Sequence, residues 1–383
     1  MEKLENPIRN LKNYLRSKER DHGLKNKNVI IRKHALYGNF IKIDDTLIAI
    51  DHWNPKADLI YISHAHMDHI PNIPNKDITK LEKGDSEVGF LCTKITKEIA
   101  EHRKREKFTF PESMWLLGKS NKTRESIYFD NLKISLIENG HTYGSRSLLI
   151  EGSERILITS DFIGENKYFG KNRTGLRGLE PIKCDYLITE CTYGSPKFTF
   201  PSFFTLKKRI NEYVKTHLTQ GFPIIILSYS FGKSQAILNM LECSKKVILE
   251  RSISNIVEIL ELNGIDFGNW EPYGNYTKNK LKKKKDYVLL IPPYYMFREP
   301  YKTLIRSGAK LVLLSGKVIS EEYRNKFPVD EYFKYSDHVD FKNLTEFISD
   351  CQPKKIVLNH GRIAEFSYFL SNLLENNKNI YFI

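Results

Sequence analysis

Four side chains that can bind metals stand within six consecutive residues. Residues 64–69 read His-Ala-His-Met-Asp-His, directly after the apolar run 59–62. Three imidazoles and a carboxylate this close together would repel one another if charged, and they would waste hydrogen-bonding groups if buried. A divalent cation removes both problems, because neutral imidazole and carboxylate are good ligands for zinc-like metals. The segment therefore predicts a metal site, and the bland alternative is a solvated histidine-rich loop.

Further candidate ligands or acids follow other strand-like runs of the chain. They are His141, Asp161, Glu190 and His360, which follow the runs 133–137, 155–159, 186–189 and 355–358, respectively. In α/β sheets, ligand sites gather outside the carboxyl ends of strands, so donors from distant parts of the sequence can converge there. Each of these residues is ordinary alone. Their joint occurrence predicts a single metal centre.

The elements that must position these residues are those of an α/β protein. Short strand-like runs dominate the first half of the chain, and they include 28–31, 40–43, 47–50 and 147–151. From Pro196 on, apolar strand runs alternate with helical patterns, which is typical of a parallel, doubly wound unit. In that part we expect strands at 222–227, 246–249, 287–291 and 310–314. We expect helices at 8–16, in part of 77–102, and at 233–243, 253–262 and 364–374.

Length and composition limit the possible partners. The 383 residues suggest about two domains, and the net charge of +14 favours a polyanionic partner over the alternative of a merely lysine-rich surface. The five cysteines are scattered, and no apolar run reaches the length of a membrane span. We therefore expect an intracellular protein, cytoplasmic or nucleoid-associated, with no membrane partner. Nothing in the sequence indicates a protein partner.

The order of these motifs resembles the four-part ligand signature of the metallo-β-lactamase superfamily. The matching strings are residues 64–69, Gly140-His141, Ser160-Asp161 and His360-Gly361. The resemblance implies an αββα sandwich that holds two divalent metal ions, Zn²⁺ before Mn²⁺ or Mg²⁺. It assigns His64, His66 and His141 to one ion, and Asp68, His69 and His360 to the second, with Asp161 bridging both. Two such cations activate a shared water for hydrolysis. The resemblance also implies that Asp68 is a catalytic residue.

A long insertion narrows the resemblance to the β-CASP group, the branch of the superfamily that processes nucleic acids. Residues 189–194 (Thr-Glu-Cys-Thr-Tyr-Gly), 336–340 (Ser-Asp-His-Val-Asp) and 359–361 (Asn-His-Gly) resemble its three motifs. The implied domains are 1–195 and 336–383 for the metallo-β-lactamase part and 196–335 for an inserted α/β domain. By this resemblance Glu190 orients metal ligands. His338 contacts the scissile phosphate and can protonate the leaving oxygen.

Residues 228–234, Ser-Tyr-Ser-Phe-Gly-Lys-Ser, follow a predicted strand and open a helix. A triphosphate-binding loop is disfavoured, because Leu227 stands where that motif needs glycine. A helix start of this composition can still hold a backbone phosphate of a bound strand, through Ser228, Ser230 and Lys233. The alternative is a simple helix cap.

The segment 190–201 indicates which nucleic acid is bound. It is similar to a proline- and aromatic-containing pattern of Artemis-type DNA repair nucleases and of exonucleases encoded beside bacterial DNA ligases. His360 is shared with RNA-cleaving members, although the ligase-associated group has it too. We therefore expect a DNA exonuclease in repair or end processing, acting on single strands or ends. The alternatives are an RNA-processing β-CASP ribonuclease, a small-molecule hydrolase of the same fold and, least favoured, a non-enzymatic scaffold.

Overall fold

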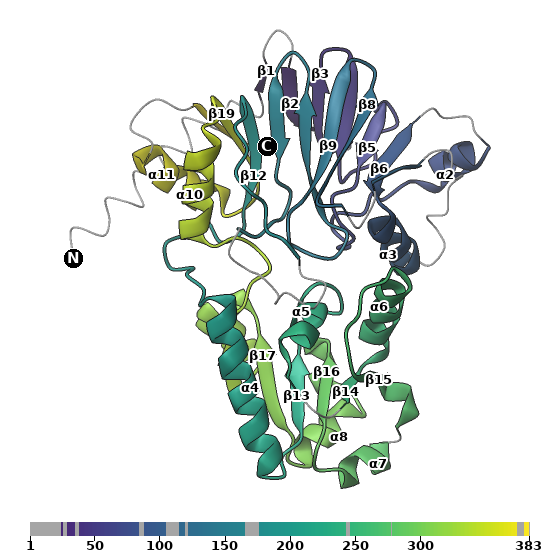
Figure 1. Ribbon diagram of the computed structural model, residues 1–383, viewed down its shortest axis with the longest axis vertical. Coiled ribbons are helices and arrows are strands. Elements are labelled where there is room, and N and C mark those ends of the chain that lie inside the picture. Colours follow the sequence, from purple (N-terminus) through teal and green to yellow (C-terminus); the bar gives the residue numbers. More distant parts are fainter. Residues whose placement is uncertain are drawn as a thin grey trace. The chain divides into compact units, whose positions relative to one another are not determined.

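A computed structural model describes residues 24–25, 29–34, 38–83, 88–104, 115–118, 122–164, 176–242, 246–276, 278–373 and 379–382. Among these residues the chain divides into two compact units (Figure 1). The first contains the described residues up to 164 together with Arg177–Thr199 and those from His338 on, and the second contains Leu176 and Phe200–Asp337. The helix expected at 8–16 lies outside the described residues. The domain bounds 195/196 and 335/336 stay predictions.

The first unit contains two seven-stranded sheets. One has the order β1-β2-β3-β4-β5-β6-β7 and the other the order β20-β19-β12-β11-β10-β9-β8. The strands of the first sheet are β1 (Leu24–Lys25), β2 (Val29–His34), β3 (Gly38–Ile43), β4 (Thr46–Ile50), β5 (Leu59–Tyr61), β6 (Gly89–Thr93) and β7 (Trp115–Gly118). Those of the second are β8 (Arg124–Phe129), β9 (Leu132–Glu138), β10 (Arg146–Glu151), β11 (Arg155–Ile158), β12 (Tyr186–Cys191), β19 (Lys355–Gly361) and β20 (Asn379–Phe382).

The two sheets pack face to face, with helices outside (Figure 1). A buried aliphatic cluster joins the inner faces, with Ile31 and Ile48 from one sheet against Leu148 and Ile188 from the other. The helices are α2 (Asn75–Glu82), α3 (Lys94–Lys104), α10 (Phe341–Cys351) and α11 (Ile363–Leu373). Helix α3 contacts β6, α10 contacts β12, and α11 contacts β19. The predicted αββα sandwich is confirmed.

Pairing directions bring the predicted ligands to one edge. Strands β11, β12 and β19 are parallel neighbours in the second sheet, and β5 lies parallel to β4 and β6 in the first. Parallel neighbours end on the same edge, so the residues that follow them are brought together.

The second unit is a six-stranded parallel sheet of order β15-β14-β16-β13-β17-β18. Its strands are β13 (Ile224–Leu227), β14 (Val247–Leu249), β15 (Trp270–Pro272), β16 (Val288–Ile291), β17 (Lys310–Leu314) and β18 (Glu331–Phe333). Its α-helices are α4 (Phe203–Thr219), α5 (Lys233–Met240), α6 (Arg251–Leu262), α7 (Lys278–Lys283), α8 (Tyr301–Arg306) and α9 (Glu321–Lys326), and its 3-10 helices are η2 (Tyr273–Asn275), η3 (Pro293–Phe297) and η4 (Gly316–Ile319). The predicted parallel, doubly wound unit is thus confirmed for this half of the chain.

Helices α4, α7, α8, α9 and α10 were not predicted, although the patterns of α4 and α10 are present in the sequence. In α4 the buried residues Phe203, Leu206, Ile210 and Val214 recur at helical spacing, and the Ser202 side chain caps the helix by accepting a hydrogen bond from the Thr205 amide. Helix α10 is capped in the same way by Asp340. No helix in the described part of the chain is long and apolar enough to span a membrane.

Candidate metal centre

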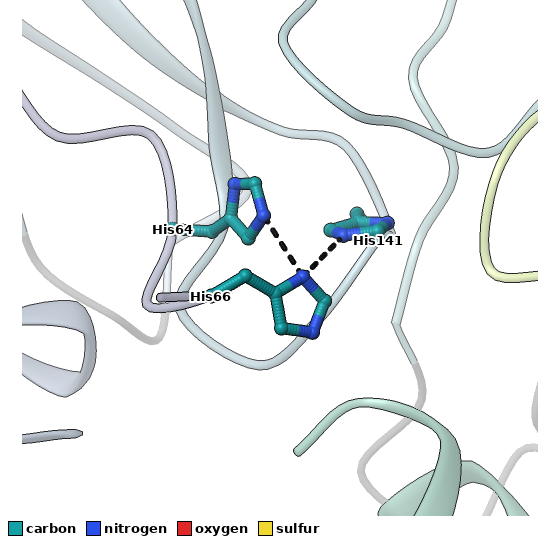
Figure 2. A group of neighbouring side chains, drawn as sticks. All are labelled: His64, His66 and His141. Carbon is teal, nitrogen blue, oxygen red and sulfur yellow. Dashed lines mark hydrogen bonds between the residues drawn. The ribbon is translucent and has the colours of Figure 1, made fainter. Parts of the chain in front are cut away.

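Three histidines from two loops converge on one point (Figure 2). His64 and His66 come from the loop after β5, and His141 comes from the loop between β9 and β10. The Nδ1 atom of His66 lies 3.0 Å from Nε2 of His64 and 3.1 Å from Nε2 of His141. His64 and His141 are buried. A ring nitrogen carries either a proton or a lone pair, so one His66 nitrogen cannot form good hydrogen bonds to both neighbours unless their protonation states match.

The Asp161 carboxylate, which is also buried, lies beside this cluster. Its Oδ2 atom is 3.4 Å from Nε2 of His69, 3.7 Å from Nε2 of His141 and 3.8 Å from Nε2 of His64. Asp161 comes shortly after the end of β11, and the preceding residue, Ser160, has a positive φ of 51° that turns the chain there. One carboxylate oxygen therefore faces histidines from both predicted ligand sets.

These separations fit a metal centre. Donors of a tetrahedral zinc site at 2.0–2.2 Å from the ion stand roughly 3.3–3.6 Å from one another. In the described residues three donor groups lie within 4.8 Å, namely His64/His66/His141, His64/His69/Asp161 and His141/Asp161/His338. Imidazole and carboxylate together suit Zn²⁺ and Mn²⁺. The donor set fits the predicted metal binding, although it does not select the ion.

Asp51 fixes the orientation of two ligand rings, and the sequence reading missed it. Its carboxylate accepts hydrogen bonds from the amide and the hydroxyl of Ser63, at 2.7 and 2.8 Å, and it lies 2.8 Å from Nδ1 of His69. The Ser63 hydroxyl lies 2.9 Å from Nδ1 of His64. Because Nδ1 of each ring donates to this network, the Nε2 atoms of both rings point inward, where each neutral ring would present a lone pair to an ion. Asp51 directly follows the predicted strand 47–50, and this position was the available signal.

The charge balance of the site also suits a cation. Burial lowers the pKa of His64 well below its usual value, and the neighbouring His69 lowers it further, so His64 is neutral as a ligand must be. Burial alone would lower the pKa of His69, but the carboxylates of Asp161 and Asp51 outweigh burial and raise this pKa to about 10. Burial opposes ionisation of Asp161, yet His69 and the other surrounding histidines hold its pKa below the usual range. Without an ion, a proton on His69 balances the carboxylates of Asp161 and Asp51, and a bound cation would take the place of that proton.

The two remaining predicted ligands lie on the solvent side. The side chain of Asp68 is 72% exposed, and its Oδ2 atom lies 3.8 Å from Nε2 of His69. His360, at the end of β19, is exposed, and its ring centre is 6.1 Å from that of His69. Neither belongs to the donor groups within 4.8 Å. Their assignment to the second ion stays a prediction, on the open side of the centre.

Glu190 and His338 form a pair at the edge of this centre. The Nδ1 atom of His338 lies 2.9 Å from Oε2 of Glu190, which is fully buried at the end of β12. Oε1 of Glu190 also accepts a hydrogen bond from the Phe162 amide, next to Asp161. His338 Nδ1 is 3.9 Å from Oδ2 of Asp161. Glu190 thus holds both His338 and the backbone beside Asp161, and the catalytic assignments of Glu190 and His338 stay predictions.

The predicted phosphate-binding residues of the second unit have partners of their own. The Ser228 hydroxyl is buried and lies 2.7 Å from that of Ser234, and the carbonyl of Ser230 accepts a hydrogen bond from Gln235. The Lys233 ammonium forms an ion pair with Asp337, whose side chain is 4% exposed. These contacts stabilise the start of α5. Phosphate binding by Ser228, Ser230 and Lys233 stays a prediction, and it would require Lys233 to leave Asp337.

Comparison with known proteins agrees with this site. No protein-family model matches the chain. A probable DNA ligase of Opitutus terrae is 28% identical over 81% of this chain, which spans 27% of that protein's length. An RNase J-like protein of Methanocaldococcus jannaschii is 24% identical, over 85% of this chain and 84% of its own length. These relatives confirm the resemblance to the β-CASP group of the metallo-β-lactamase superfamily.

A solved structure supports the fold of this protein. A protein of unknown function from Enterococcus faecalis superimposes with a TM-score of 0.57 at 15% identity, over 91% of this chain and 95% of the other. At that identity the likeness shows the fold alone. The prediction of a β-CASP nuclease is confirmed at the level of the family, whose relatives include proteins named for RNA cleavage and for DNA ligation.

We predict that Asp51→Asn weakens Zn²⁺ binding about 10- to 100-fold, because loss of the carboxylate frees the His69 ring. Chelator competition followed by metal analysis measures this change. Asp185→Asn is the matched control, since Asp185 precedes β12 and pairs with Lys354. Equal metal affinity in the two variants would contradict the role of Asp51.

We predict that His338→Ala retains the metal content of the wild-type protein, whereas His141→Ala loses at least one ion. His141 Nε2 faces His66 and Asp161, while His338 Nδ1 is engaged by Glu190. Metal analysis of the purified variants checks this expectation. Loss of metal from His338→Ala would instead make His338 a ligand, within the donor group His141/Asp161/His338.

We predict that Lys233→Met lowers the free energy of unfolding by about 3–5 kcal/mol, because it leaves the buried Asp337 carboxylate without its counter-ion. The control is Lys310→Met, which removes a pair with Asp330 whose side chains are about a third exposed, at a cost of about 1 kcal/mol or less. Urea denaturation of both variants provides the comparison. If the two costs are equal, Lys233 is available for a phosphate.

Proposed function

We propose that this protein is a metal-dependent nuclease that hydrolyses phosphodiester bonds, with DNA ends or single strands as its substrate. The observation that carries the proposal is the meeting of the histidine–aspartate centre with the Glu190–His338 pair in the first unit. A small-molecule hydrolase needs the metal centre but has no use for a second histidine held by a buried acid beside it.

The predicted ligands would bind two cations. His64, His66 and His141 would hold one cation, and Asp68, His69 and His360 the second, with Asp161 between them. Two bound cations lower the pKa of water and neutralise the charge that develops on the phosphate. The buried donors exclude water from one side, and the exposed Asp68 and His360 leave the other side open to a polymer.

His338 would hold the phosphate and move a proton. Its Nδ1 atom points at the Glu190 carboxylate, which favours a proton on that nitrogen and directs Nε2 to the phosphate oxygen. When the imidazole is protonated, Nε2 donates that proton to the leaving oxygen as the bond breaks. Glu190 stabilises the charged ring, since its own carboxylate is buried and anchored by the Phe162 amide.

DNA is favoured by the segment 190–201 and by the relative named as a probable DNA ligase. RNA is the second candidate, because the RNase J-like relative matches the chain over most of both lengths. The finer assignment to a DNA exonuclease in repair or end processing rests on the same resemblance.

We expect matched 5′- and 3′-labelled DNA and RNA oligonucleotides to be cleaved with Mn²⁺ or Zn²⁺, and Asp68→Ala to lower the rate at least about a hundredfold, more than loss of an outer partner would. Time courses on gels give rate, polarity and preference together. Asp45→Ala is a control, since Asp45 is an exposed aspartate at the turn between β3 and β4. Equal rates for Asp68→Ala and wild type would refute the proposal, and preference for RNA would select the second candidate.

A further inference from the structure

Half-exposed aromatic rings gather at one place in the second unit. Among the large apolar side chains exposed in the described residues, Tyr229, Tyr294 and Phe297 are 38, 50 and 52% exposed. Tyr229 follows β13, and Tyr294 and Phe297 lie in η3, which follows β16. Strands β13 and β16 are parallel neighbours, so their following loops lie at the same edge of the sheet.

These rings pack against further aromatic side chains, of which Phe327 is buried. Phe327 is fully buried, and its ring centre lies 5.1 Å from that of Tyr294 and 6.3 Å from that of Phe297. Tyr323 lies 5.2 Å from Phe327, and its hydroxyl is 3.4 Å from the hydroxyl of Tyr229. The exposed rings are therefore parts of a packed cluster, which limits the entropy that they lose when a ligand binds.

Positive charge accompanies this aromatic surface, defined here by Tyr229, Tyr294 and Phe297. The Lys326 ammonium lies 5.2 Å from the centre of the Tyr294 ring, whereas the Lys233 ammonium, 5.5 Å from that of Tyr229, is buried and paired with Asp337. Residues 200–337 contain 22 lysines and arginines against 14 aspartates and glutamates. The surface thus offers flat apolar faces and an excess of cations together.

We propose that the aromatic surface binds the unpaired bases of single-stranded nucleic acid by stacking. Rings of this kind stack on any base, and a cation beside them such as Lys326 meets the phosphates of the same strand. A double helix hides its base faces, so the surface selects single strands or frayed ends. This inference rests on the proposed function for the class of substrate, and it adds where the insert would hold that substrate and why it must be unpaired.

The charge argues for a nucleic acid over another occupant. A second copy of this chain carries the same positive excess and would be repelled. An apolar peptide would have no use for Lys326, whereas a nucleotide uses the ring and the ammonium at once.

The test measures binding without cleavage, in the full chain after chelation of metals. The variant Tyr294→Leu/Phe297→Leu keeps apolar bulk but removes both rings, and Phe204→Leu is the control, since Phe204 is 76% exposed in α4 of the same unit. The ligands are a fluorescent thymidine oligonucleotide of about 20 nucleotides, long enough to exceed common site sizes, and an abasic oligonucleotide with the same phosphates. Thermal melting confirms that each variant is folded.

We expect the double variant to raise the Kd for the thymidine strand about tenfold or more and to leave the Kd for the abasic strand within about twofold. The variant Tyr294→Phe/Phe297→Tyr, which keeps both rings, should bind as wild type does. Equal weakening on both strands, or none on either, overturns the proposal. Loss of a dimer in the double variant without a change in Kd also overturns it and indicates self-association.

Failure of this inference and failure of the nuclease proposal can be told apart. If wild type binds the thymidine strand through these rings but does not cleave it with Mn²⁺, the nuclease proposal fails and the stacking surface stands. If wild type cleaves and the double variant binds unchanged, only the stacking surface fails.

Discussion

Ring nitrogens and a carboxylate oxygen face one another at the edge where β5, β11 and β12 end, with few protons to share among them. Burial makes this arrangement costly, because a polar atom taken out of water needs a partner of opposite character. The network of Asp51 and Ser63 increases the demand, since it holds the outer nitrogens of His64 and His69 and turns their Nε2 atoms inward. A cation is the partner that satisfies all of these atoms together. The sandwich provides the rigid strand ends that such a centre needs.

Hydrophobic patterning explains how those strand ends reach one edge. Apolar runs such as those of β11, β12 and β19 are buried on both faces, one against the opposite sheet and the other against α10 and α11. Strands of this kind are parallel and need long connections, and the longest of them, between β12 and β19, holds Phe200–Asp337 of the second unit. The insertion therefore sits between Glu190 and His338 in the chain, yet leaves these two residues in contact.

The sequence predicted the parts of this centre that depend on residue type and order. The string 64–69 and the donors after later strands sufficed, because ligand chemistry restricts the residue types and strand ends restrict their place. Asp51 escaped prediction, since an aspartate after a strand is ordinary until its carboxylate is seen against Ser63 and His69. The partner of Lys233 could not be predicted either. A Gly-Lys-Ser string at a helix start indicates phosphate binding, and only the tertiary fold brings Asp337, more than a hundred residues away, to the same ammonium.

The two predicted cation positions differ in their surroundings, and this difference has chemical consequences. His64 and His141 are buried and held in place by the fold, whereas Asp68 and His360 are exposed to solvent. Ligands that are already ordered lose little conformational entropy when they bind, so the buried set favours tight and constant occupation. An exposed carboxylate and imidazole remain partly hydrated, so Asp68 and His360 would hold a cation on the side that a phosphate can reach. If both predicted positions are filled, this asymmetry would make the buried one the more permanent and the exposed one the more accessible, with Asp161 near both.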